Sequence, residues 1–249
     1  MRMLVLAVLT IFTALGFAPP GAHAYEAPWS NLDFLRDQTW SQINNRLANQ
    51  NLKTLRDSID RKAEKPDPKK EERKPTPDSK KKAPSRAVLD LGERASTNLA
   101  PLRPYLAETR LTEEQAAKVL AMYGQAAALL DVPANDSASG IAAFLAGSYA
   151  AYTNKPFPDA LYKPLYEQFA ESLTSDDALE RRPLTQRVEY YQRLVVVGML
   201  FQLLQLEMQR NPQPDQISAM RKAAGSAFQE IAGVSPESIR FTADGLSIR

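Results

Sequence analysis

The sequence predicts an all-α protein, a helical bundle of about five helices that follows a separate amphipathic helix and a disordered basic linker. Three observations favour this fold class. Between residues 87 and 249, apolar residues recur at helical spacing, capping residues and prolines divide the pattern into segments, and one segment is apolar on nearly every side. We therefore divide the chain into residues 1–24, 25–61, 62–86 and 87–249.

Residues 1–24 have the tripartite pattern of a secretory signal peptide. Arg2 provides a positive start, an apolar stretch follows, and Ala22-His23-Ala24 matches the small-x-small cleavage pattern. An uncleaved membrane anchor is the alternative, but the apolar stretch is shorter than the roughly 20 residues that span a bilayer. We expect cleavage after Ala24, a periplasmic or secreted location, and a mature chain that is not an integral membrane protein.

The chain contains no Cys, and its single His is His23, within the predicted signal. A mature chain without imidazole or thiol groups cannot build a Ser-His-Asp or Cys-His nucleophile, the usual zinc or haem sites, or a disulfide. The sequence therefore identifies no catalytic residue, no metal ligand and no cofactor.

Within residues 25–61, the stretch from 30 to 61 is typical of an amphipathic helix, and we call residues 25–61 the arm. Its apolar residues are Leu32, Leu35, Trp40, Ile43, Leu47, Leu52, Leu55 and Ile59. A single helix cannot bury this stripe itself, so the arm is expected to dock on residues 87–249, pair with a second copy, or bind a partner. The irregular step from Leu47 to Leu52 disfavours a coiled coil. The candidate partner-binding residues are Leu32, Leu35, Trp40, Ile43 and Leu47.

Residues 62–86, the linker, contain ten Lys or Arg, five Asp or Glu, and several prolines. This composition predicts an extended, disordered segment. The linker acts either as a solubilising spacer or as a tether that binds weakly, through its positive charges, to an anionic surface such as lipid headgroups or cell-wall polymer. Nucleic acid is not expected as a partner, because the linker has no aromatic residue for base stacking. Residues 87–249 have the opposite balance, with 15 basic and 19 acidic residues.

In the predicted bundle, Thr112 and Gln115 form a capping box for a helix that continues through Leu130. A second helix begins after Asp136, which we interpret as its N-cap, and ends near Tyr152. Small residues form one stripe on this second helix and would let a neighbouring backbone approach closely: Gly140, Ala143, Gly147 and Ala151.

A third helix is predicted over residues 159–173, with Pro164 causing a kink or a later start. Its apolar face carries Leu161, Leu165, Phe169 and Leu173. A long helix from about Pro183 to Arg210 is apolar nearly all round in its middle and is expected to be the central buried helix. Its 13-residue apolar run, 194–206, contains two Gln and is too short for a membrane span. The last helix, 214–232, ends at Gly233, and a short hairpin follows.

Four short motifs resemble an uncharacterised family of exported bacterial helical domains: Asn135-Asp136, Ser148-Tyr149-Ala150-Ala151-Tyr152, Gln186 to Tyr190 before the Gly198 helix, and Thr242-Ala243-Asp244-Gly245-Leu246. The resemblance covers roughly residues 95–249, which leaves the arm and the linker outside it. It implies a helical fold and export, and it carries no activity or catalytic residues.

The leading functional hypothesis is a non-enzymatic periplasmic interaction module that binds another envelope protein through its arm and helical domain. The alternative is an envelope ligand-binding domain or a carboxylate-dependent cell-wall hydrolase. Its candidate carboxylates are Glu167, Glu171, Glu189 and Glu207. Their spacing is also typical of solvated helix faces, and no pattern in the sequence places two of them across a cleft.

Overall fold

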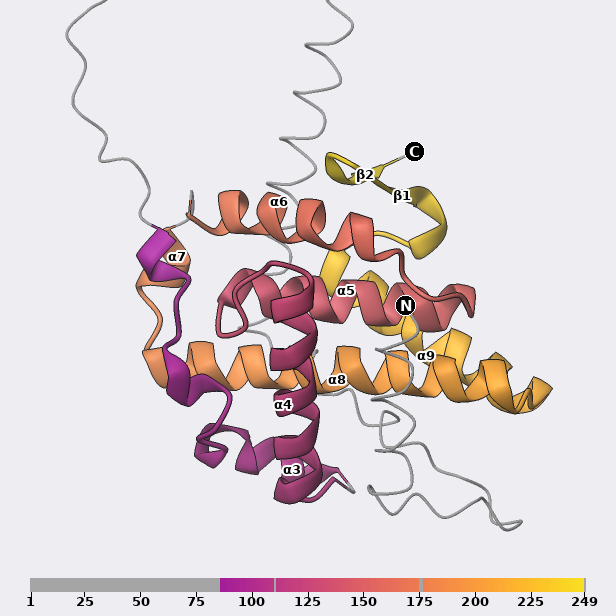
Figure 1. Ribbon diagram of the computed structural model, residues 1–249, viewed down its shortest axis with the longest axis horizontal. Coiled ribbons are helices and arrows are strands. Elements are labelled where there is room, and N and C mark those ends of the chain that lie inside the picture. The colour runs from indigo at the N-terminus through magenta and orange to yellow at the C-terminus, as the bar shows by residue number, and fades with distance from the viewer. Residues whose placement is uncertain (1–85, 110, 175–176, 249) are drawn as a thin grey trace, which may run out of the picture.

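The computed structural model describes residues 86–109, 111–174 and 177–248. The predicted signal and arm and nearly all of the linker lie outside these residues, as do the candidate partner-binding residues Leu32, Leu35, Trp40, Ile43 and Leu47. Within the described part the all-α prediction is confirmed. Helices make up most of it, and the strands form one small two-stranded sheet (Figure 1).

The first described element is the short 3-10 helix η2, Arg86–Val88, and further 3-10 turns connect the larger elements. The α-helices are α3 Arg103–Glu108, α4 Glu113–Leu129, α5 Ser137–Thr153, α6 Tyr162–Thr174, α7 Asp177–Glu180, α8 Leu184–Arg210 and α9 Pro214–Ala232. The strands are β1 Ile239–Thr242 and β2 Gly245–Ile248.

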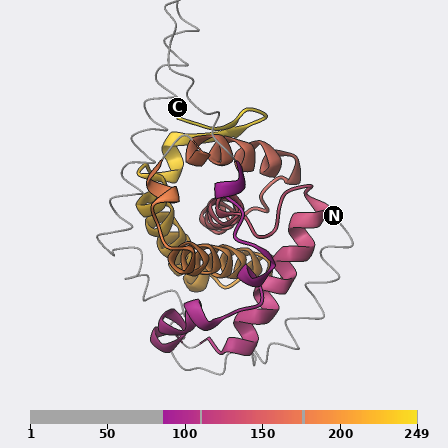
Figure 2. The same ribbon diagram turned by 90° about the vertical axis from the view of Figure 1, so that its left-hand side faces the viewer.

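The central helix of the domain is α5. In Figure 2 it is seen nearly end-on, with α4, α6, α8 and α9 around it, and α6, α8 and α9 pack directly against it. Nearly all residues of α5 from Ser137 to Ala151 are buried. The middle of α8 is buried as predicted, but the expectation that α8 takes the central position is wrong. The small side chains of α5 explain this, since they let helices approach it on several sides.

The stripe of small residues brings α5 and α8 into backbone contact, as the sequence predicts. A Cβ added at Gly147 would lie 2.0 Å from the carbonyl oxygen of Gly198, so neither residue has room for a side chain. One seven-residue step earlier on α5, a Cβ at Gly140 would lie 3.0 Å from Cδ2 of Tyr191. Because seven residues along α5 correspond to seven residues along α8, the two helices run parallel.

Local sequence signals fix several of the helix ends. Thr112 and Gln115 form the predicted capping box at the start of α4. At the other end of the chain, α9 stops at Gly233, whose φ of 73° lies in the left-handed region that favours glycine. Pro164 delays rather than kinks its helix: a 3-10 turn precedes α6, and the proline is the third residue of α6.

The predicted hairpin is present and is fastened to α6. Strands β1 and β2 are antiparallel, with Phe241 opposite Leu246. The side chain of Gln168 on α6 donates from Nε2 to the carbonyl oxygen of Leu246 (2.9 Å) and accepts at Oε1 from the amide of Leu246 (2.8 Å). The ring of Phe241 packs edge-on against Tyr149 of α5, with centroids 4.8 Å apart. The hairpin thus covers one side of α6.

Candidate functional site

The first described residues, 86–91, contact the helical domain beside α6 and at the start of α5. Leu89 is fully buried, and its carbonyl oxygen accepts a hydrogen bond from the amide of Ser137 at 3.0 Å. The amide of Leu91 donates to the carbonyl oxygen of Asn135, also at 3.0 Å. These contacts hold the entering segment on the start of α5 and place Arg86, three residues before Leu89, next to α6.

Arg86 forms an ion pair with Glu167, with 2.6 Å between Nη2 and Oε2. Two hollows lie on either side of this pair and share Arg86, Lys163 and Glu167 as lining residues. The larger, about 670 Å³, extends along the outer face of α6 to Asp244 in the hairpin turn. The smaller, about 380 Å³, extends to Asp131 in the loop before α5. We call the two hollows together the entry groove.

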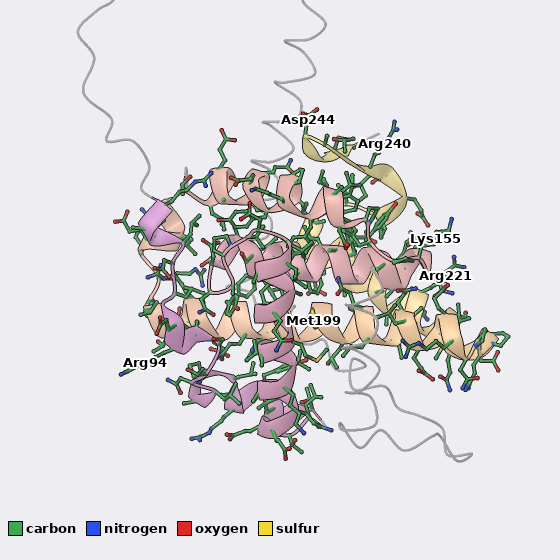
Figure 3. All side chains as sticks on the ribbon, viewed as in Figure 1. Arg94, Lys155, Met199, Arg221, Arg240 and Asp244 are labelled. Carbon is green, nitrogen blue, oxygen red and sulfur yellow. The ribbon has the colours of Figure 1, made fainter. Side chains whose placement is uncertain are left out.

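Acidic side chains outnumber basic ones in the entry groove. The lining carboxylates are Asp131, Glu167, Glu171 and Asp244, and the lining cations are Arg86 and Lys163. Lys163 is paired with Asp131, and this ion pair raises the pKa of the lysine and lowers that of the carboxyl. Figure 3 places Asp244 at the outer tip of the hairpin, above α6. Among the described lining residues, four carboxylates thus accompany two cations.

Asp136 is buried where the entering segment meets α5. Its side chain accepts at Oδ1 from the amides of Ala138 (2.8 Å) and Ser139 (3.4 Å), which confirms the predicted N-cap. Burial of the carboxylate raises its pKa to about 6, although the two amide hydrogen bonds act in the opposite direction. A structural cap with a perturbed pKa explains this residue without a catalytic role.

Four tyrosines pack close to Asp136, between α4, α5, α6 and α8. The hydroxyl of Tyr123 donates to the carbonyl oxygen of Ser139 at 3.0 Å and lies 3.1 Å from the hydroxyl of Tyr162. Tyr191 donates to the carbonyl oxygen of Ala134, and Tyr166 lines the smaller hollow. Burial raises the pKa of all four hydroxyls, to about 12 for Tyr123 and Tyr166. They remain protonated at neutral pH and act as hydrogen-bonding and packing groups.

The four carboxylates considered for hydrolysis are spread over two helices. Glu189 is paired with Arg193 one turn further along α8, at 2.5 Å. Glu207 follows Glu189 on the same helix at a distance of about 27 Å along the axis, from the rise of 1.5 Å per residue. Glycosidases need two carboxyl groups about 5 to 9.5 Å apart on either side of the scissile bond. Glu189 and Glu207 cannot form such a pair.

Glu167 and Glu171 lie one turn apart on α6 and line the same hollow. They sit on one wall of an open groove, and Glu167 is bound to Arg86. Among the described residues, no group of three or more His, Cys, Asp or Glu is placed to hold a metal ion. None of the helices in that part of the chain is long and apolar enough to cross a membrane.

The entry groove was not predicted from the sequence. Its charged residues come from the end of the linker, the loop before α5, the face of α6 and the hairpin turn. Nothing in the local sequence links these four segments, because each of them alone is typical of a solvated surface. The one available signal was the difference in charge balance between the linker and residues 87–249.

The fold and the groove define a helical domain with an enclosed central helix and an open, acidic surface groove. The chain belongs to DUF6683, a family of unknown function, whose model matches residues 1–249. The match extends over the arm and the linker, so the narrower span expected from the four short motifs is corrected. No curated protein matches the chain, and no solved structure matches it.

Proposed function

We propose that this protein is an exported, periplasmic interaction module that binds another envelope protein through its arm and helical domain. The observation that carries the proposal is the extent of the core within the described residues. That core joins side chains from the entering segment, every helix from α3 to α9 except the short α7, and the hairpin. A domain with such a core does not need the apolar stripe of the arm to complete its hydrophobic core. The stripe is therefore available to bind a partner.

Neither same-helix pair among the four candidate carboxylates has the arrangement that the hydrolase alternative needs. The carboxylates on α8 are too far apart, and those on α6 share one exposed face. We therefore do not propose catalysis. The proposed location rests on the signal pattern of residues 1–24 and on cleavage after Ala24.

Crosslinking in the producing cells, followed by mass spectrometry, tests the interaction. One variant disrupts the apolar stripe by Leu35→Ser, Trp40→Ala and Ile43→Ser, and a matched control changes the opposite face by Ser41→Ala and Asn45→Ala. We expect the native chain and the control to capture the same envelope protein and the stripe variant to lose it. Equal capture by the stripe variant would overturn the role of the arm.

The same samples test export. Mass spectrometry of the purified protein is expected to find Tyr25 as its first residue, in the fraction outside the cytoplasmic membrane. A protein that keeps residues 1–24 and stays in the cytoplasm would contradict the proposal.

A further inference from the structure

We propose that residues 86–91 form a clasp that detaches locally from the start of α5 as the pH rises toward neutrality, with Asp136 as the group that responds. Detachment exposes the buried side chains of Leu89 and Leu91. It also moves the point at which the chain leaves the helical domain from Arg86 to Gly92. This device concerns described residues only, and it does not depend on partner binding by the arm.

The clasp ends at a hinge. Gly92 follows it directly, with a φ of 74° in the left-handed region that favours glycine, and a Cβ there would meet nothing within 4 Å. Beyond the hinge the chain is anchored again, because Ala95 is fully buried and its carbonyl oxygen accepts from Nε2 of Gln192 at 2.7 Å. The clasp can therefore swing about Gly92 while the rest of the domain stays folded.

The clasp meets the start of α5 as one isolated antiparallel bridge, in which Asp90 lies opposite Asp136. The two backbone hydrogen bonds made by Leu89 and Leu91 flank this pair at 3.0 Å each. Residues placed between such bonds form the closer kind of antiparallel pair, and like charges directly opposite each other are destabilising. The bridge thus sets two carboxyl groups against each other at the point where the clasp is held.

The charge of Asp136 is disfavoured while the clasp is closed. Asp136 is only 6% exposed, and burial raises the pKa of its carboxyl to about 6. The negative charge of Asp90 acts in the same direction on this pKa. The amides of Ala138 and Ser139 and the positive charge of Arg86 act in the opposite direction.

The groups that face Asp136 from the other elements stay neutral over the same range of pH. They are the hydroxyls of Tyr123 on α4, Tyr166 on α6 and Tyr191 on α8, and burial raises the pKa of each. Arg86 and Asp90, the charged groups that act most on Asp136, both belong to the clasp.

Detachment returns Asp136 to water, where its pKa falls back toward 3.8. The closed clasp therefore binds the proton more tightly than the open clasp does. Its stabilisation is complete below about pH 4 and is lost as the pH rises through about 6, which increases the opening equilibrium by up to about 100-fold. The ionised carboxylate still caps α5 in the open form, because its bonds to Ala138 and Ser139 lie within α5.

Native-state hydrogen exchange tests the clasp, with rates corrected for the intrinsic effect of pH on exchange. The amides of Ser137 and Leu91 report on opening, because their hydrogen bonds join the clasp to the domain. Buried amides in the middle of α5 and α8, such as those of Leu145 and Val196, report on global unfolding. The variants are Asp136→Asn and Asp90→Asn, and Asp215→Asn in the first turn of α9 is the matched control.

We expect the two clasp amides to exchange faster than the core amides, with an opening equilibrium that rises about tenfold or more between about pH 4.5 and pH 7. The rise should be absent in Asp136→Asn, smaller in Asp90→Asn and unchanged in the control. The same rise in Asp136→Asn as in the native chain would overturn the proposal. Clasp amides that exchange no faster than the core amides would also overturn it, because the segment would then open only when the whole domain unfolds.

Discussion

At the scale of single residues, the contact between Gly147 and Gly198 sets the distance between α5 and α8. A methyl group at position 147 would lie 2.0 Å from the Gly198 carbonyl oxygen, so the backbones must separate to accept it. We predict that Gly147→Ala lowers the free energy of unfolding by about 2 kcal/mol or more, as overpacking of a rigid core does. Urea denaturation measures this change.

Gly124 provides the matched control, because it lies within α4 and a Cβ there would meet nothing within 4 Å. Gly124→Ala is expected to raise the free energy of unfolding by about 0.5 to 1 kcal/mol, since alanine restricts the unfolded chain more than glycine. If both substitutions had the same effect, the close approach of α5 and α8 would be wrong.

Asp136 is expected to make the stability depend on pH. Its pKa is raised from 3.8 to about 6 in the folded protein, so the folded state binds a proton more tightly than the unfolded state. The resulting stabilisation is complete below about pH 4 and is lost as the pH rises through 6. Asp136→Asn keeps an oxygen acceptor for the amides of Ala138 and Ser139 and removes the titration.

Relative to the native protein, the Asp136→Asn variant should therefore gain about 2 to 3 kcal/mol in unfolding free energy between about pH 4 and pH 7.5. Denaturation curves across this range measure the gain. Parallel pH profiles for the two proteins would show that Asp136 is not buried as a charged group.

At the scale of elements, one side chain of α6, Gln168, makes both hydrogen bonds that join α6 to Leu246 of the hairpin. Gln168→Ala removes both hydrogen bonds to Leu246, each of which contributes about 1 kcal/mol, and should speed amide hydrogen exchange in β1 and β2. Gln168→Glu keeps the acceptor for the Leu246 amide and loses the donor, so an intermediate effect is expected. Unchanged exchange in both variants would mean that Phe241 and its ring contacts suffice to hold the hairpin.

The elements also show why some helix ends were predictable. The capping box of Thr112 and Gln115, the N-cap Asp136 and the C-terminal Gly233 act within three or four residues of themselves. Such signals are complete in a short stretch of sequence. The direction of α8 relative to α5 depends on contacts between residues about 50 positions apart, and no local signal specifies it.

At the scale of the whole molecule, the described residues contain a connected core that includes every major helix. We predict that residues 86–249 alone fold cooperatively, with a thermal midpoint within about 2 °C of the chain from residue 25 to 249. Calorimetry of the two chains makes the comparison. A fall of more than about 5 °C would show that the arm covers part of the domain, and the arm would then be less available for a partner.

The sequence by itself determined the fold class, the positions of the main helices, the capping residues and the stripe of small residues, because each depends on spacing within one segment. Only the tertiary structure decided that α5 rather than α8 is central. Hydrophobicity identifies a buried helix but not which buried helix is central. Helix α5 is central because its glycines and alanines let neighbouring helices pack closely against it on several sides. Only the tertiary structure assembled the entry groove, since its charges come from four segments that meet through packing.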